Sequence, residues 1–160
     1  DGKRGPIHNI LFSPWLNMEG EREGYLELEK VDPMVGVNGA RILAKLWYSP
    51  GDHKNYLVSP IFGDFTNICE STVIVGTREL ILLDCRQLKE TAQQINYKLH
   101  YYEFENMHHV FPLFPIPEAE KVWDIVLPIL TGSQPVVKNR RPIRNDPNKI
   151  HSKKRESQIN

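Results

Sequence analysis

Two residues, Glu79 and His109, are of the types that move protons in hydrolytic catalysis. Acyl transfer requires a nucleophile, an imidazole that accepts the proton of the nucleophile, and a carboxylate that orients the imidazole. In such an arrangement Glu79 would orient the ring and His109 would act as the general base. The sequence therefore predicts the acid and the base of a hydrolase, provided that the fold brings these two residues together.

The same residues also have simpler interpretations. A carboxylate in the first turn of a helix is favoured by the helix dipole, whether or not it is catalytic. The pair His108 and His109 could lie on the surface, and neither has acidic or cysteine partners at a metal-ligand spacing. The two cysteines, Cys69 and Cys85, are not at a ligand spacing either, so no metal and no cofactor are predicted. Spacing alone leaves a catalytic and a structural role open.

Glu79 follows the clearest strand of the sequence. Residues 71–76 include a β-branched run, Val-Ile-Val, and end at a glycine, which is typical of a parallel strand buried on both faces. Apolar residues at helical spacing then predict a helix over residues 80–95, with Asp84 on its solvent side. Glu79 is therefore expected in the turn between a strand and a helix.

His109 follows a second predicted strand, at residues 98–105, which is rich in Leu and Tyr. A short strand is predicted at residues 10–12 and a closing helix over residues 118–130. The buried side of that helix would consist of Val122, Val126, Ile129 and Leu130. This alternation predicts an α/β fold with about three parallel strands and flanking helices, in which the sheet is incomplete and has an open edge. Catalytic groups gather at the carboxyl ends of such strands, so we expect His109 and Glu79 at the same edge.

The segment between the first two strands gives weaker predictions. Residues 19–30 are charged and turn-prone, and they are not expected in the core. Asp32 and Pro33 predict the N-cap and first residue of a helix, which two glycines would break into two short pieces. The apolar side of these pieces would consist of Val35, Ile42, Leu43 and Leu46.

The charge of the chain is balanced overall but not along its length. Lys plus Arg and Asp plus Glu each number 20, so no global field favours nucleic acid or anionic membranes, and no nucleic-acid partner is predicted. Residues 133–160 carry eight basic and two acidic side chains, and we expect a basic, disordered tail after a domain at residues 1–132. No apolar run reaches the roughly 18 residues that span a bilayer.

Four stretches of the chain resemble the carboxy-terminal part of α/β-hydrolases, in the hormone-sensitive-lipase-like branch of esterases and deacetylases. These stretches are FSPWLNM, DPMVGVNGARILAKLWYSP with YLVSPIFGDF, VGTRELILLDCRQL, and HHVFPLFPIPEAEKVW. They cover about residues 8–130, and within the branch the chain is most similar to fungal steryl acetyl hydrolases. The resemblance implies a partial α/β-hydrolase fold and an ester hydrolase or deacetylase acting on acetylated sterols or other lipids. It also implies the endoplasmic reticulum, whereas the residues themselves leave the compartment open.

The resemblance assigns roles within the predicted triad. The turn GTREL matches a position that often reads G-x-D-E in relatives, and Arg78 stands where many of them have an acid. Glu79 is then the acid of the turn, and Asp84 is a poorer second choice. The histidine before Val-Phe matches His109, so His108 is its neighbour and not the base.

Two parts of such an enzyme occur nowhere in these 160 residues, namely an HGGG-like oxyanion loop and a G-x-S-x-G nucleophile elbow. We therefore expect the chain to be inactive alone and to require a complementing amino-terminal half as its partner. One alternative is a non-catalytic, hydrolase-like remnant or interaction protein. Another is that the basic residues of the tail bind anionic lipid or RNA.

Overall fold

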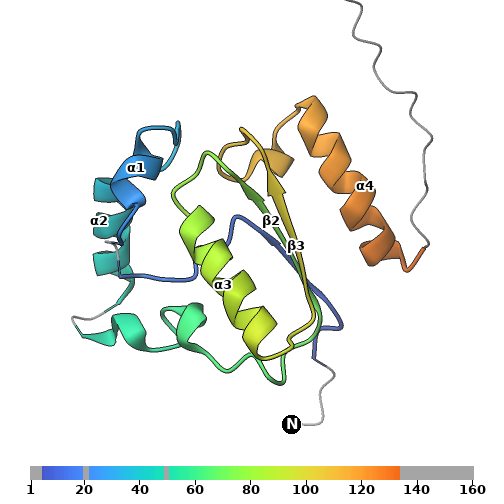
Figure 1. The fold of residues 1–160 in the computed structure, drawn as a ribbon, viewed down its shortest axis with the longest axis horizontal. Helices are drawn as coiled ribbons and strands as arrows, with labels where there is room; N and C mark the ends of the chain where they lie inside the picture. The colour runs from blue at the N-terminus through green and yellow to red at the C-terminus, as the bar shows by residue number, and fades with distance from the viewer. Residues whose placement is uncertain (1–4, 20–21, 49–50, 134–160) are drawn as a thin grey trace, which may run out of the picture.

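Three parallel strands form an open sheet in the order β1-β2-β3 (Figure 1). The computed structural model describes residues 5–19, 22–48 and 51–133. The strands are β1 (Asn9–Phe12), β2 (Ser71–Gly76) and β3 (Leu99–Phe104). The predicted α/β fold, with three parallel strands, flanking helices and an incomplete sheet, is confirmed. Of the tail predicted at residues 133–160, all but residue 133 lies outside the described residues.

Four helices and three short 3-10 turns connect and cover the described strands. The helices are α1 (Tyr25–Glu29), α2 (Val37–Trp47), α3 (Leu82–Gln94) and α4 (Pro117–Thr131). The 3-10 turns are η1 (Asp52–Lys54), η2 (Pro60–Phe62) and η3 (Phe111–Leu113). None of the helices of the described residues is both long and apolar enough to cross a membrane.

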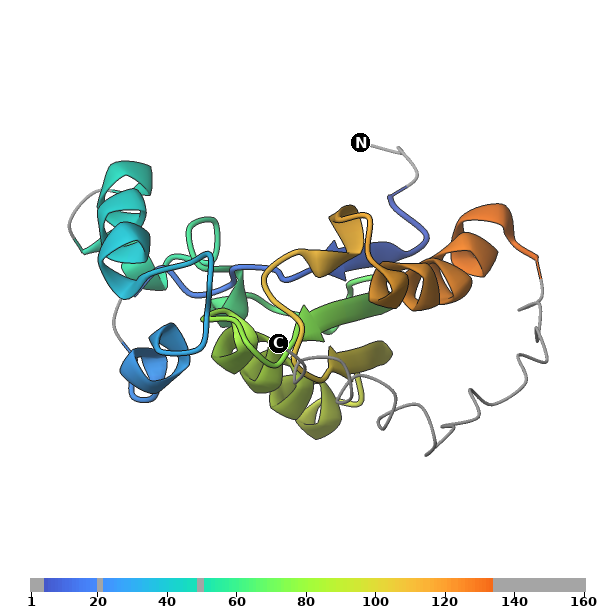
Figure 2. The same cartoon turned by 90° about the horizontal axis from the view of Figure 1, so that it is seen from above.

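Helices α3 and α4 pack on opposite faces of the sheet, with β2 between them (Figure 2). Successive side chains of a strand point to opposite faces, so Val73 and Val75 pack with Leu88 of α3, while Ile74 packs with Val122 of α4. Every residue of β2 is buried as a result. The continuous apolar pattern of this strand is thus explained by helices on both sides.

The last turn of α4 does not pack as its sequence pattern predicts. Leu130 was expected on the buried side, yet it is 65% exposed. The turn extends beyond the cluster that Val122 and Val126 form with Ile74 and Phe111, so no core remains for it to cover. The helix contacts the sheet through its first three turns.

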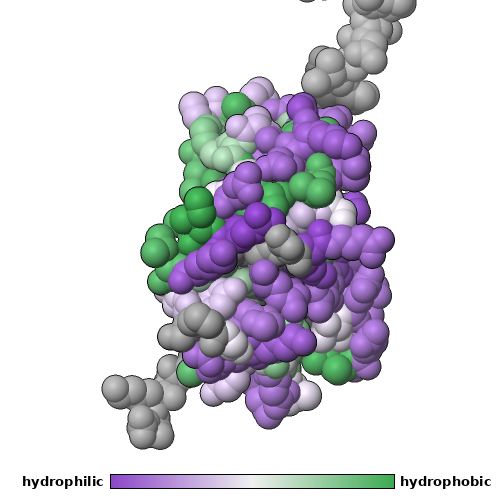
Figure 3. Space-filling model, turned by 90° about the vertical axis from the view of Figure 1, so that its left-hand side faces the viewer, coloured by the Kyte–Doolittle hydropathy of each residue, from purple (hydrophilic) through white to green (hydrophobic). Residues whose placement is uncertain are grey.

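The segment before β2 also folds differently from its sequence pattern. Helix α2 is one helix of 11 residues and begins well after Asp32, so the prediction of two short pieces was wrong. The side predicted to be apolar faces outward, since Ile42, Leu43 and Leu46 are 60%, 59% and 79% exposed. Hydrophobic side chains accordingly gather on this face of the molecule (Figure 3). Small residues allow the helix to approach the core closely, and they are the ones it buries: Val37, Ala40 and Ala44.

A buried carboxylate, Asp84, holds α1 against the start of α3. Asp84 was expected on the solvent side of its helix, but its side chain is fully buried. It accepts hydrogen bonds from the backbone N–H groups of Leu16 and Asn17, from Arg22 Nη1 at 2.7 Å and from the Tyr25 hydroxyl at 3.0 Å. Tyr25 is itself 2% exposed, so part of the segment expected outside the core belongs to it. These four donors offset the free-energy cost of burying the Asp84 carboxylate.

Burial raises the pKa of the Asp84 carboxyl above its ordinary value, and the hydrogen bonds from Asn17 and Arg22 oppose this shift because they favour the charged form. The sequence pattern missed this residue because a polar side chain at a helix position is usually solvated. Here the segment before α1, which includes Leu16, Asn17 and Arg22, packs over the start of α3 and covers Asp84.

At the end of β2 the chain passes very close to the loop that follows β3. The N–H of Arg78 donates to the carbonyl oxygen of Met107 at 3.0 Å. A Cβ at position 76 would lie 2.1 Å from that same oxygen, so only glycine leaves room for the loop. Gly76 therefore permits the approach of the segment that carries His109.

Replacing Gly76 by alanine should lower the free energy of unfolding by about 1–3 kcal/mol, because the added methyl group displaces backbone that cannot give way. Urea denaturation measures this change. The control is Gly39→Ala in α2, where nothing lies within 4 Å of the added Cβ. That variant should be more stable by about 0.5–1 kcal/mol, from helix propensity alone. Wild-type stability of Gly76→Ala would contradict the close approach.

Candidate active site

The structure brings Glu79 and His109 into direct contact at the carboxyl edge of the sheet. Glu79 lies in the turn between β2 and α3, and His109 lies in the loop between β3 and η3. Because β2 and β3 stay in parallel register up to the pair Gly76 and Phe104, both loops leave the sheet at the same point. The Nδ1 atom of His109 is 2.8 Å from Oε2 of Glu79.

The Glu79 carboxylate is completely buried, whereas the side chain of His109 remains 24% exposed. The second carboxylate oxygen of Glu79, Oε1, accepts hydrogen bonds from the N–H of Gly76 and from the hydroxyl of Ser13, the latter at 2.8 Å. A buried carboxylate needs such donors, and together they fix its orientation. The carboxylate is therefore rigidly presented to the imidazole.

Ser13 is a residue of this site that sequence reasoning missed. It follows β1 and is 4% exposed, with its hydroxyl donating to Glu79 and accepting the N–H of Val110 at 3.0 Å. The single hydroxyl thus connects the acid to the residue that follows His109. Nothing in the sequence distinguishes this serine, which precedes a proline as several others do.

Ser13 and Val110 both have left-handed backbone conformations, with φ of 45° and 46°. For residues other than glycine such conformations cost on the order of 1–3 kcal/mol each, and they cluster at functional sites. The residue before a proline is normally extended, which makes Ser13 still less expected. The hydrogen bond between these two residues joins the end of β1 to the loop that carries His109.

The ring of His109 is oriented as a general base requires. With its Nδ1–H donated to Glu79, the neutral imidazole presents Nε2 as a proton acceptor. Within residues 5–19, 22–48 and 51–133, no side chain is hydrogen-bonded to Nε2. His108 differs, since its Nδ1 donates to the carbonyl oxygen of His109 and its ring meets Phe114 edge-on. His108 supports the loop and does not face Glu79.

Two other reactive groups lie near this site without joining it. Asp84, the second choice for the acid, has its hydrogen bonds with the segment before and within α1. Cys85 is fully buried, and burial together with the charges of Glu79 and Asp84 holds the pKa of its thiol well above the usual range. A protonated, buried thiol is a poor nucleophile. The described part of the chain contains no group of three metal-ligating side chains.

A parallel α/β sheet with an acid–histidine pair at its carboxyl edge defines a hydrolase-like class of fold. A family model described as alpha/beta hydrolase fold matches residues 1–113. The chain belongs to this family.

Two curated relatives are enzymes named for ester cleavage. An esterase of Acinetobacter venetianus is 29% identical over 122 residues, which are 72% of this chain and 39% of the esterase. An acetyl-hydrolase of Streptomyces hygroscopicus is 22% identical over 122 residues, which are 75% of this chain and 41% of that protein. The chain thus spans about two fifths of the length of these relatives.

Solved structures agree with the branch expected from the sequence. A crystal structure of an esterase from the bacterial hormone-sensitive lipase family superposes with a TM-score of 0.70 at 26% identity, covering 76% of this chain and 41% of that one. A hormone-sensitive lipase from a metagenome library superposes with a TM-score of 0.74 at 21% identity, covering 81% and 45%, and shows the fold alone. The resemblance to the hormone-sensitive-lipase-like branch is confirmed, and the finer similarity to steryl acetyl hydrolases stays a prediction.

Ser13→Ala removes the hydroxyl that joins Glu79 to the loop of His109. We expect the free energy of unfolding to fall by about 1–3 kcal/mol, because the part-buried N–H of Val110 loses its acceptor and the buried carboxylate of Glu79 loses a donor. The Nδ1 proton of His109, observed by NMR, should also exchange faster with water.

The matched control is Ser59→Ala. Ser59 is fully buried and its hydroxyl accepts the N–H of Met18, so the same type of bond is lost away from the site. This variant should lose stability without changing the His109 proton. If both variants affected that proton equally, Ser13 would have no special part in the site.

Proposed function

We propose that this chain supplies the acid and the base of a serine ester hydrolase, and that a segment outside it supplies the nucleophile and the oxyanion hole. The observation that carries the proposal is the 2.8 Å contact between Nδ1 of His109 and the fully buried carboxylate of Glu79. The names of the relatives, an esterase and an acetyl-hydrolase, support the ester as the substrate class.

In the proposed reaction a serine hydroxyl attacks the carbonyl carbon of the ester while Nε2 of His109 takes the hydroxyl proton. The resulting imidazolium is stabilised by the carboxylate of Glu79. The proton then passes to the alkoxy oxygen, the alcohol leaves, and an acyl-serine remains. Water repeats the sequence on the acyl-serine, which releases the acid and regenerates the serine.

Acetyl esters are the first substrates to test. The relative named acetyl-hydrolase supports a short acyl group, and the resemblance to steryl acetyl hydrolases extends this proposal to acetylated sterols or other lipids. The exposed apolar side chains of α2 offer a surface compatible with an apolar alcohol portion.

The decisive experiment uses the complete product of the reading frame that contains these 160 residues. Hydrolysis of p-nitrophenyl acetate should fall by about 10⁶-fold in kcat on His109→Ala and by about 10⁴-fold on Glu79→Gln. A fluorophosphonate probe, which labels activated serines, should react with the wild type and not with His109→Ala.

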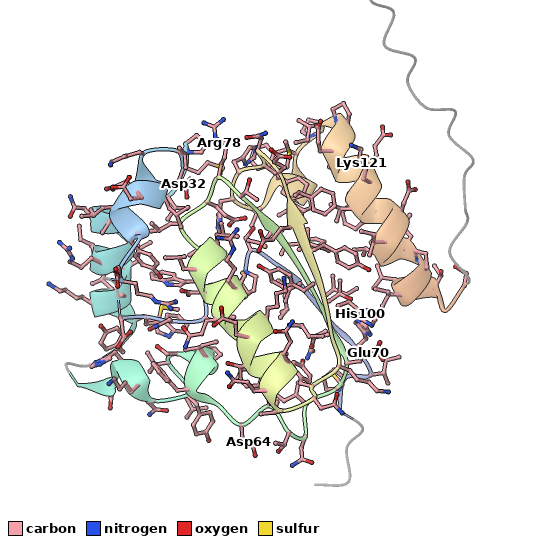
Figure 4. The ribbon with its side chains drawn as sticks, viewed as in Figure 1. Asp32, Asp64, Glu70, Arg78, His100 and Lys121 are labelled. Carbon is pink, nitrogen blue, oxygen red and sulfur yellow. The ribbon has the colours of Figure 1, made fainter. Side chains whose placement is uncertain are left out.

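The chain provides a matched control in a second histidine–glutamate pair. His100 and Glu70 are hydrogen-bonded at the opposite end of β3, well exposed to solvent (Figure 4). His100→Ala and Glu70→Gln should leave kcat unchanged. Turnover that survives His109→Ala would refute the assignment, and so would equal losses in both pairs.

A second candidate function is a non-catalytic, hydrolase-like interaction protein. The observations that favour it are the edge strand β1, which among residues 5–19, 22–48 and 51–133 pairs only with β2, and the exposed apolar side of α2. Exposed edges and apolar patches of this kind bind other protein surfaces. A complete product that contains no glycine-flanked serine and labels no probe, yet retains the Glu79–His109 contact, would support this function over the enzyme.

A further inference from the structure

The turn between α1 and α2 is bound to the turn that carries Glu79. Asp32 lies in the first of these turns, and its Oδ2 accepts the N–H of Leu80 at 2.7 Å. Its other oxygen, Oδ1, accepts the N–H groups of Met34 and Val35 at 2.8 and 2.9 Å. One carboxylate therefore closes its own turn and reaches across 48 positions to the residue after Glu79.

The direction of the Leu80 N–H is coupled to the backbone conformation of Glu79. The carbonyl of Glu79 and the N–H of Leu80 belong to one planar peptide unit, so fixing the N–H also fixes the backbone of the acid. Leu80 is fully buried and stands before the first turn of α3, where N–H groups have no partner within the helix. The bond to Asp32 supplies that partner.

Arg78, on the other side of Glu79, is bound to the same turn. Its Nε donates to the carbonyl oxygen of Val31 at 3.2 Å. Figure 4 shows Arg78 and Asp32 beside each other, where the turn after β2 approaches the segment after α1. Both neighbours of Glu79 in the sequence are thus held by residues 31–32. The arginine that replaces the acid of many relatives has a contact of its own.

We propose that Asp32 is a positioning residue for Glu79, acting through the peptide unit between Glu79 and Leu80 so that the carboxylate stays aligned with His109. The inference rests on the proposed function in naming Glu79 as the acid of a triad. The positioning itself can be tested without turnover, because it concerns only the contact between Glu79 and His109. Asp32 touches neither the imidazole nor any reacting atom, so its role is indirect.

The test is Asp32→Asn in the 160-residue chain, followed by NMR. An asparagine keeps one acceptor oxygen but presents an NH₂ group at the other position, so either Leu80 or the pair Met34 and Val35 loses its acceptor. We expect the Nδ1 proton of His109 and the amide of Leu80 each to exchange about tenfold faster than in the wild type. The amides of β2 should keep their protection.

Two further variants complete the design. Asp64→Asn is the matched control, because the exposed Asp64 closes a similar turn through the N–H and hydroxyl of Thr66, away from the site. It should leave the His109 proton unchanged. Arg78→Met removes the contact with Val31 and keeps Asp32, so a smaller change in the same direction is expected. If Asp32→Asn does not fold, this variant decides the question.

In a folded Asp32→Asn variant whose Leu80 amide exchanges faster, an unchanged His109 proton would overturn the proposal. If the Leu80 amide is unchanged, the asparagine has kept that bond, and Arg78→Met decides the question. Equal acceleration throughout β2 would overturn it too, since Asp32 would then contribute only to global stability. In Arg78→Met, an unchanged His109 proton would count against it in the same way. None of these readouts needs turnover. Absence of esterase activity in the complete product would therefore defeat the proposed function while leaving this inference standing.

Discussion

The burial of the Glu79 carboxylate is the constraint on which the rest of the structure depends. A carboxylate withdrawn from water is very unfavourable unless hydrogen-bond donors replace the lost solvent. Three donors do so here, from the end of β1, the end of β2 and the loop after β3. Each strand of the sheet thus contributes one group to the same carboxylate. The conditions that satisfy the buried charge are the same ones that assemble the acid–histidine pair.

A second buried carboxylate, Asp84, shows how environment separates two acids that are only five positions apart. Its donors come from residues 16–17, from Arg22 and from the Tyr25 hydroxyl, and they attach α1 to the sheet. Glu79 instead faces the loop of His109. The resemblance left Asp84 as the second choice for the acid, because it is the next carboxylate after the turn. In the structure, Glu79 lies in the turn before α3 and contacts His109, whereas Asp84 lies within α3 and contacts α1.

The parts of the fold set by local pattern could be predicted from the sequence, and the parts set by tertiary contact could not. The run Val73, Ile74, Val75 ends at a glycine, which was sufficient to place β2, and strand ends then placed Glu79 and His109 at one edge. Ser13 was missed because its role depends on a left-handed backbone that a residue before proline rarely adopts. The outward apolar side of α2 was missed because periodicity finds an apolar face but not what covers it.

The incomplete sheet does not weaken the acid–histidine pair, because every group that orients it lies within the described residues. The donors to Glu79, the acceptor for the N–H of Val110, and the contacts of Arg78 and Leu80 with the turn at Asp32 are all internal. The exposed edge of β1 and the apolar side of α2 lie at surfaces where further chain could pack. A nucleophile brought by such chain would meet an imidazole whose tautomer and direction are already fixed. For the proposed ester hydrolase, preorganisation of this kind would lower the cost of orienting His109, and the groups that provide it stand at the three strand ends.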